Sequence, residues 1–514
     1  MMKCQLDFVV FTFVLLFYRS VSGLCPYRCQ CDEERLTAIC DDAKLDVVPI
    51  TLNPDLRELH LEKNSIKGIM SAFNVYRNLE YLDMSGNQLV TLGRNNFERQ
   101  QKLQILLLGY NMISSLQRMT FFGLNSLHIL KLTGNFIQQL PEQVFSELSS
   151  LEVLDLSENS ISTISNHAFI GLARIKILLL RENKVMQIPK AAFGPLPHLI
   201  SLDLGLNSFP LVEDYVFSNL LGLETLKLDS CGIREIRKHA FSALKHLTDL
   251  LLQDNLLNVI PTEAFRYLKS VRELQIGQNN FRKIQANAFT GLMNLRSLVI
   301  NSAPLLKRIE NDAFSCNDNL QHIAMNHNKK LSYIGKDAFT SLPFLRTVSL
   351  RDNAFHTLPA EILPWQNLEH FDIRDNPLVC NCSISWLLRL LQNFNYSNHV
   401  DPDVTLITCE TPPLLRDILL KDLTPEDLGC YISEMQKIMT WTFATVGILI
   451  IVLIVIVLWY RQKVANDLKI KCSTSLSESQ FDTRYGQETL RQGLTPEREW
   501  IVKIGREPYP GRLV

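Results

Sequence analysis

The chain has 514 residues, a formal net charge of −1 and a hydrophobic fraction of 46%. A nearly neutral chain without a long basic run has no global field that would attract nucleic acid, so we expect no nucleic-acid partner. Part of the hydrophobic content is concentrated in two apolar runs near opposite ends of the chain.

The first apolar run predicts a signal peptide over residues 1–23. The run Phe8–Phe17 follows Lys3 and is too short to span a bilayer. Val21 and Gly23 are acceptable residues for the −3 and −1 positions of a signal-peptide cleavage site before Leu24. Such a segment predicts an oxidising extracellular compartment for the residues after the cut.

Residues 24–54 hold the first of two cysteine clusters, in the spacing C-x3-C-x-C-x8-C: Cys25, Cys29, Cys31 and Cys40. Four close cysteines can hold zinc, but behind a secretory signal they favour disulfides, and we expect no metal. The spacing alone leaves three connectivities open. The cluster lies where a repeat array would otherwise expose an apolar end and a bare sheet edge.

Residues 55–377 repeat one pattern, seen clearly in Leu151–Arg174, LEVLDLSENSISTISNHAFIGLAR. One such unit cannot bury its apolar edge alone, but stacked copies bury it against each other. The asparagine position of the pattern occurs fourteen times, with an asparagine in twelve of them, at Asn64, Asn87, Asn111, Asn135, Asn159, Asn183, Asn207, Cys231, Asn255, Asn279, Ala303, Asn328, Asn353 and Asn376. A phenylalanine keeps step with it from Phe73 to Phe339.

This is the leucine-rich-repeat pattern, L-x-x-L-x-L-x-x-N-x-L. It predicts an α/β solenoid of about 14 repeats, curved, with a parallel sheet on its concave face. We expect each asparagine to turn inward and bond backbone groups at the bend after its strand. Repeats 11 and 12 carry one extra residue each, in NSAPLLKRI and NHNKKLSYI, and predict a local irregularity. Cys231 and Cys316 lie too far apart to bridge and are expected to be buried free thiols.

Residues 378–431 hold the second cluster, Cys380, Cys382, Cys409 and Cys430, in NPLVCNCSISWLLRLL and the segment after it. Both clusters resemble the cysteine caps of extracellular leucine-rich-repeat proteins. The resemblance implies the pairs Cys25–Cys31, Cys29–Cys40, Cys380–Cys409 and Cys382–Cys430. It also implies a short helix with Trp386 and an apolar plug over the last coil.

After a linker at 432–437, residues 438–460 form an apolar run long enough to span a membrane. Arg461 and Lys463 follow it, so the basic side stays cytoplasmic and the repeats lie outside, as in a single-pass type I plasma-membrane protein. We expect the tail, 461–514, to be mostly disordered. Its end, Gly-Arg-Leu-Val, is a weak match to a ligand of a PDZ groove.

The chain shows no phosphate loop, nucleophile elbow or zinc-protease pattern, so we expect neither an enzyme nor a cofactor. The inner wall of a solenoid displays variable residues on a rigid frame, which indicates binding. Apolar groups with interleaved charges predict a protein-binding patch on the concave face: Tyr81, Ile105, Leu107, Tyr110, Ile129, Lys131, Asp155, Ile177, Leu179 and Asp203. Glycan sequons at Asn381 and Asn395 both lie in the C-terminal cap, and Asn395 is the better candidate.

The caps, repeats, span and short tail resemble the single-pass leucine-rich-repeat recognition proteins of animals, such as capricious, tartan and the neuronal leucine-rich-repeat transmembrane proteins. That resemblance implies adhesion or cell recognition through an extracellular or cell-surface protein partner, including homophilic binding. One alternative is a regulatory subunit or co-receptor that modulates another receptor or an ion channel. Another is innate pattern recognition without a signalling domain of its own.

Overall fold

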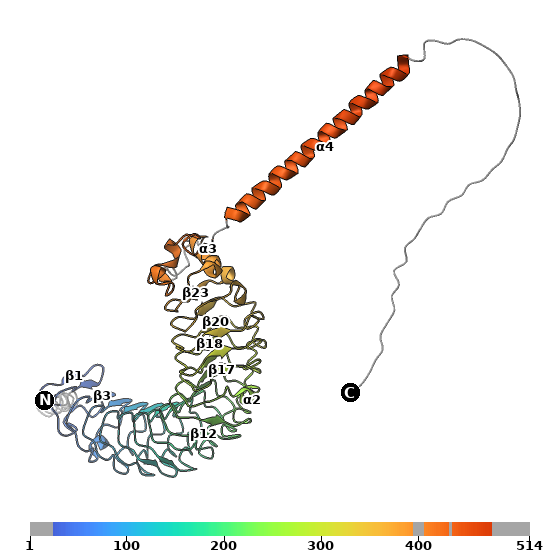
Figure 1. Ribbon diagram of the computed structural model, residues 1–514. Helices are drawn as coiled ribbons and strands as arrows, with labels where there is room; N and C mark the ends of the chain where they lie inside the picture. Colours follow the sequence, from blue (N-terminus) through green and yellow to red (C-terminus); the bar gives the residue numbers. More distant parts are fainter. Residues whose placement is uncertain (1–23, 394–405, 431–433, 475–514) are drawn as a thin grey trace, which may run out of the picture. The chain divides into compact units, whose positions relative to one another are not determined.

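A computed structural model describes residues 24–393, 406–430 and 434–474 of the chain. It divides after Cys430 into two units, which we describe separately. The first unit contains all the strands and both cysteine clusters, and the described part of the second is one long helix (Figure 1). The predicted signal peptide, Asn395 and the last forty residues, including the terminal Gly-Arg-Leu-Val, lie outside the described residues.

A single sheet of sixteen strands lines the inner face of the first unit (Figure 1). Fourteen of these strands each begin one coil of the solenoid, and we number the coils 1 to 14 in this order: β3 (Glu58–His60), β4 (Tyr81–Asp83), β5 (Ile105–Leu107), β6 (Ile129–Lys131), β8 (Val153–Asp155), β10 (Ile177–Leu179), β11 (Ser201–Asp203), β13 (Thr225–Lys227), β15 (Asp249–Leu251), β16 (Glu273–Gln275), β18 (Ser297–Val299), β20 (His322–Ala324), β22 (Thr347–Ser349) and β23 (His370–Asp372). All fourteen pair in parallel, which confirms the predicted curved leucine-rich solenoid.

The short strands follow from the alternation of their side chains. In β5 the middle residue, Leu106, is fully buried, while Ile105 and Leu107 are half-buried on the concave surface. The middle strand residue is buried in every coil because these residues, mostly leucine, pack against their counterparts in the coils on either side. The core is therefore continuous from the first cap to the second, as nearest-neighbour stacking requires.

The repeated asparagines form a buried ladder, as predicted. The Asn183 amide donates to the carbonyls of Leu156 (3.0 Å) and Leu180 (3.1 Å) and accepts from the N–H of Ile161 (2.9 Å). Each asparagine thus links its own coil to the preceding one, and the carbonyl of Leu180 is bonded again by Asn207. These bonds satisfy backbone groups that the bend leaves without a strand partner.

Two coils break the ladder. Cys231 lies on it with its Sγ 3.1 Å from the carbonyl of Leu204, and burial raises the pKa of this thiol to about 12. The thiol therefore stays protonated at neutral pH and acts as a weak donor. Ala303 contributes no side-chain bond, and its N–H donates to Asn328 instead. Cys316 is also unpaired but is half-buried rather than buried, because it lies on the outer side of coil 11.

Phenylalanine rings stack along the outer side of the coils, with neighbouring centroids 5.4 to 6.5 Å apart. A helical turn, α2 (Thr262–Phe265), holds one of these rings in coil 9. The flank that connects the sheet to the rings carries short parallel pairs: β7 (Gln139–Leu140) with β9 (Thr163–Ile164), β12 (Leu211–Val212) with β14 (Glu235–Ile236), and β17 (Lys283–Ile284), β19 (Arg308–Ile309) and β21 (Tyr333–Ile334).

Disulfide-bonded caps cover both ends of the solenoid. At the first end β1 (Gln30–Asp32) runs antiparallel to β2 (Thr37–Ile39), which continues the sheet into β3. The disulfides are Cys25–Cys31, Cys29–Cys40, Cys380–Cys409 and Cys382–Cys430, the pairs that the resemblance implied.

At the second end α3 (Ser385–Asn393) buries Leu387, Leu388 and Leu391. Trp386 donates from Nε1 to the carbonyl of Leu358 (3.1 Å), which anchors the helix on coil 13. Coil 13 contains short 3-10 turns at Ala360–Ile362 and Trp365–Asn367, and a further such turn, Ala72–Asn74, lies in coil 1. The cap contains three more, at Cys382–Ile384, Pro413–Leu415 and Leu420–Asp422.

The second unit is α4 (Glu434–Thr474). Its segment Lys437–Asn466 is long and apolar enough to cross a membrane by length and composition, and it begins close to the predicted start at Ile438. Lys463 lies over the ring of Trp459, with 5.2 Å from Nζ to the ring centroid. This pair marks the point where the apolar segment becomes basic.

Candidate partner-binding surface

The first strand residue of each coil forms a column across the concave sheet, and this column is apolar in coils 2 to 6 only. Strand register places these five residues side by side: Tyr81, Ile105, Ile129, Val153 and Ile177. From coil 7 the column turns polar, beginning with Ser201 and Thr225. We call the five residues the apolar stripe. Sequence reasoning selected four of them and missed Val153, which occupies the same column.

The second half of the predicted patch lies on the third residue of each strand, beyond the buried middle residue. Leu107 and Leu179 are half-buried there, Lys131 is exposed and Asp155 is half-buried. The Asp155 carboxylate accepts from the N–H of Ser157 (3.0 Å), so the aspartate also shapes the bend of its own coil. Leu107 and Leu179 therefore extend the stripe, while Lys131 and Asp155 interrupt it with charge.

Tyr110 extends the apolar surface toward the flank of the solenoid. It has a left-handed backbone, φ 54°, and its side chain is 60% exposed. The ring lies over Gly134, where a Cβ would come within 2.5 Å of its Cδ1. Only glycine in the next coil leaves room for this position of the ring.

Sequence reasoning missed two further apolar residues beside Tyr110. Met112 (49% exposed) and Phe136 (54% exposed) each follow a ladder asparagine, a position that other coils fill with residues such as Ser160 and Lys184. The N–H of Phe136 donates to the carbonyl of Ile113, which places these residues in adjacent coils. The available signal was an apolar residue in a column that is otherwise polar in coils 1 to 7.

A buried ion network lies in coils 6 to 8, directly beyond the stripe. Arg181 donates to both carboxylate oxygens of Asp229 (3.2 and 2.8 Å) and lies 3.5 Å from Asp203, which also pairs with Lys227 at 3.4 Å. The hydrogen bond with Asp229 raises the pKa of Arg181 despite the opposing effect of burial. The guanidinium crosses Gly205, where a Cβ would come within 2.2 Å of Nη1.

Because of this ion network, Asp203 is not a free charge on the concave surface. Its side chain is only 5% exposed, and its carboxylate also accepts from the N–H of Gly205 (3.0 Å). The carboxylate is therefore engaged within the solenoid before any partner arrives. Its role as a partner contact stays a prediction, and what the structure shows is a fixed polar boundary to the stripe.

The opposite end of the stripe is also polar. The ring of Tyr81 lies 4.7 Å from that of His60, and its hydroxyl donates to Asp83 at 3.4 Å. Burial, followed by the Asp83 charge, raises the pKa of Tyr81 to about 12. Tyr81 therefore offers a neutral amphipathic ring at the edge of an apolar surface, a type common at interfaces.

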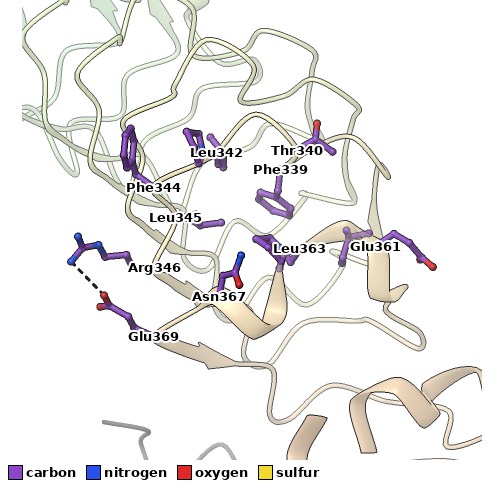
Figure 2. Close-up of a pocket in the computed structure, with 13 residues that line it drawn as sticks. Phe339, Thr340, Leu342, Phe344, Leu345, Arg346, Glu361, Leu363, Asn367 and Glu369 are labelled. Atoms are coloured by element: carbon purple, nitrogen blue, oxygen red, sulfur yellow. Dashed lines mark ion pairs between the residues drawn. The ribbon is translucent and has the colours of Figure 1, made fainter. Parts of the chain in front are cut away.

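The described cavities do not coincide with this surface. A groove of about 630 Å³ lies between coils 12 and 13, where the phenylalanine stack ends at Phe339 (Figure 2). Phe344 borders it, and Arg346 pairs with Glu369 at 3.4 Å on its rim (Figure 2). Within residues 24–393, 406–430 and 434–474 no group of three histidine, cysteine or acidic side chains is arranged to hold a metal ion.

The sequon asparagine that the structure describes, Asn381, is exposed beside the Cys382–Cys430 disulfide. Its Oδ1 accepts from the N–H (2.9 Å) and the hydroxyl (2.6 Å) of Ser383, the third residue of the sequon. Glycosylation at Asn381 and Asn395 stays a prediction.

Comparison with family models gives matches over the solenoid. A model described as "Leucine rich repeat" matches residues 77–137, 125–185, 174–233 and 222–281, and one described as "BspA type Leucine rich repeat region (6 copies)" matches 258–379. Together the matches run from residue 77 to 379, more than half of the chain. The chain belongs to the leucine-rich-repeat proteins.

Among curated leucine-rich-repeat relatives, Protein toll of Drosophila melanogaster is 33% identical over 67 residues, 12% of this chain and 6% of toll. Trophoblast glycoprotein of Mus musculus is 30% identical over 113 residues, 21% of this chain and 25% of that protein. The matched segments thus cover a quarter or less of both relatives.

Solved leucine-rich-repeat structures share the fold over more of the chain. An LRR protein of Leptospira interrogans matches with a TM-score of 0.58 and 25% identity, over 71% of this chain and 94% of that one. TLR13 in complex with ssRNA13 matches at 0.56 and 24%, over 73% and 61%. Toll in complex with Spatzle, from Drosophila, matches at 0.55 and 19%, over 74% and 62%.

Proposed function

We propose that this leucine-rich-repeat protein is a single-pass cell-surface receptor for adhesion or recognition, with its solenoid outside the cell. It binds a protein partner through the apolar stripe and the adjoining Leu107 and Tyr110. In this role the solenoid holds its partner without transforming it, and it acts as a scaffold rather than an enzyme.

The continuous apolar surface of coils 2 to 6 carries this proposal. Aliphatic and aromatic groups surrounded by polar residues make up the buried core of protein interfaces. Here the stripe runs between the polar group at Tyr81 and the ion network at Arg181. A fixed frame adds to its suitability, because strand register and the ladder order these side chains before binding and lower the entropic cost of association.

Two features support an extracellular solenoid. Both caps contain disulfides, which persist in oxidising compartments. Basic residues follow the apolar segment of α4, beginning with Arg461 and Lys463, and such residues stay on the cytoplasmic side. Toll, whose structure shares this fold, was solved in complex with Spatzle, which supports partner binding by a protein of such an architecture.

The test uses cells that express the full chain and a panel of potential partner cells, including cells that express the same chain. Leu107→Arg combined with Tyr110→Ala places a charge beside the apolar stripe and removes the exposed ring. Loss of a central interface contact costs at least about 2 kcal/mol, which corresponds to a roughly 30-fold loss of affinity. Leu251→Arg, at the same strand position in coil 9, is the matched control.

We expect the double variant to reach the cell surface at the normal level and to lose cell binding, while the control binds normally. Normal binding by the double variant would reject the stripe as the partner site. If no expressing cell bound any partner cell, while co-expression altered a second membrane receptor, the adhesion role would be rejected in favour of a regulatory subunit.

A further inference from the structure

The charge of the chain is nearly balanced overall but not along the solenoid. Between Arg266 and Arg351 there are thirteen lysines and arginines and five acidic residues. The apolar stripe belongs to coils 2 to 6, so this basic region in coils 9 to 13 is a separate feature. Neither the fold nor the proposed partner site accounts for it.

Part of this charge forms an ordered array on the flank of coils 10 to 12. We call it the basic ridge, and its members are Arg282, Lys283, Lys307, Arg308, Lys329 and Lys330, all exposed.

The backbone of the ridge fixes the positions of these residues. Lys283 in β17 lies directly opposite Arg308 in β19, and the N–H of Lys307 donates to the carbonyl of Arg282 (2.9 Å). Two cationic pairs are therefore stacked at the spacing of adjacent strands, about 4.8 Å.

The irregularity of coils 11 and 12 contributes to the ridge. Coil 12 has its extra residue in the turn after Asn328, and Lys329 and Lys330 occupy that turn. The flank positions that carry Arg282 and Lys283 in coil 10 carry Ser162 and Thr163 in coil 5. The leucine-rich framework thus does not require basic residues there.

Most of the ridge charge has no acidic partner. Lys283 pairs with Glu310 at 3.0 Å, and Lys329 pairs with Asp352. Among the described residues, the other four members, Arg282, Lys307, Arg308 and Lys330, make no ion pair. Like charges directly opposite in a sheet are destabilising, so the array costs stability in the free protein.

We propose that the basic ridge binds a linear sulfated polysaccharide of the cell surface. A cluster of fixed cations fits an extended chain that carries repeated sulfate groups. Coils 10 and 11 offer two aligned cationic pairs. Coil 12 adds Lys329 and Lys330 from the turn before β21, whose aligned residue is Tyr333. This choice rests on the proposed extracellular position of the solenoid.

Single-stranded RNA is the competing polyanion, and the ridge is a poor match for it. Proteins that hold single strands combine cationic grooves with aromatic side chains on which bases stack. The one aromatic residue within the ridge strands is Tyr333, and the guanidinium of Arg308 lies over its ring at 5.0 Å from the centroid. The face on which a base would stack is therefore partly occupied.

The experiment measures binding of a heparin oligosaccharide to the purified full chain in detergent. The ridge variant is Arg282→Glu, Lys307→Glu, Arg308→Glu and Lys330→Glu. The control variant reverses the same number of exposed charges that make no ion pair within the described part of the chain: Lys67→Glu, Arg99→Glu, Arg118→Glu and Lys184→Glu. If the ridge variant fails to fold, glutamine replaces glutamate at the same four positions.

We expect the wild-type chain to bind at about 0.1 M salt and to lose binding at about 1 M salt, where charges are screened beyond about 3 Å. The ridge variant loses at least about 10-fold in affinity, equivalent to about 1.4 kcal/mol, and the control variant changes little. The desulfated oligosaccharide does not bind.

Equal losses in the ridge and control variants would overturn the proposal, as would absence of heparin binding by the wild-type chain. Tighter binding of a single-stranded RNA of equal charge would overturn the choice of polysaccharide. The variant Leu107→Arg with Tyr110→Ala should bind heparin normally, so failure of the ridge and failure of the apolar stripe give different results.

Discussion

Replacing Asn183 with alanine tests the ladder that holds the coils together. The amide is buried and accepts from the N–H of Ile161 at 2.9 Å, and in its absence that N–H has no other acceptor among the described bonds. The carbonyls of Leu156 and Leu180 each keep a second donor, from Asn159 and Asn207. The substitution therefore leaves one buried group without a partner and weakens two others.

The expected cost follows from those three losses. A buried N–H without an acceptor costs about 1–3 kcal/mol, and each lost hydrogen bond to a carbonyl that keeps another contributes about 0.5–1 kcal/mol. We expect Asn183→Ala to lower the free energy of unfolding by about 2–5 kcal/mol. Asn183→Cys should cost less, because the thiol of Cys231 donates to a ladder carbonyl at the equivalent position in coil 8.

The assay is equilibrium unfolding of the full chain in denaturant, followed by circular dichroism. Hydrogen exchange of coils 5 to 7 reports whether the loss is local. Asn166→Ala, at an exposed asparagine whose side chain makes no described hydrogen bond, is the control and should stay within about 0.5 kcal/mol of the wild type. A cost for Asn183→Ala as small as that of the control, or a greater cost for cysteine than for alanine, would refute the reasoning.

Two further predictions concern Tyr110 and Asp372. Gly134→Ala should destabilise the chain more than Gly232→Ala. Both glycines have left-handed backbones (φ 68° and 70°), but only the Cβ at 134 would collide with Tyr110. Thermal unfolding checks this, and equal shifts of the melting temperature in the two variants would contradict it. Burial raises the pKa of Asp372, but its bonds with Arg374 (2.7 and 2.9 Å) outweigh burial and hold the pKa below its ordinary value. This carboxylate therefore stabilises the folded state above pH ~4, and that stability is lost as the pH falls through the lowered folded-state pKa. Arg374→Met should thus reduce the dependence of the free energy of unfolding on pH below pH ~4. An unchanged pH profile would contradict this.

The fold was largely predictable because each column of the solenoid appears in the sequence as a residue type that recurs at a fixed spacing. Asparagines such as Asn159 and rings such as Phe169 return at a fixed spacing, and stacking leaves them only one common arrangement. The pattern also predicted the number of coils and the irregular coils, with Ala303 off the ladder as a visible exception.

The candidate surface was less predictable because its properties depend on contacts between coils. Asp203 reads as a free charge in its column, but Arg181 reaches it from the preceding coil across Gly205. Phe136 reads as a core residue near the bend, and it is exposed because Asn135 turns inward before it. Such relations require the distances that only the folded chain provides.

Photo-crosslinking on living cells tests the central claim most directly. A photoreactive residue replaces either Leu107 beside the apolar stripe or Leu251 at the equivalent position of coil 9, in the full chain on cells bound to partner cells. The account predicts covalent adducts to a protein of the partner cell from position 107 and none from position 251. Adducts from position 251 alone, or in equal yield from both positions, would contradict it.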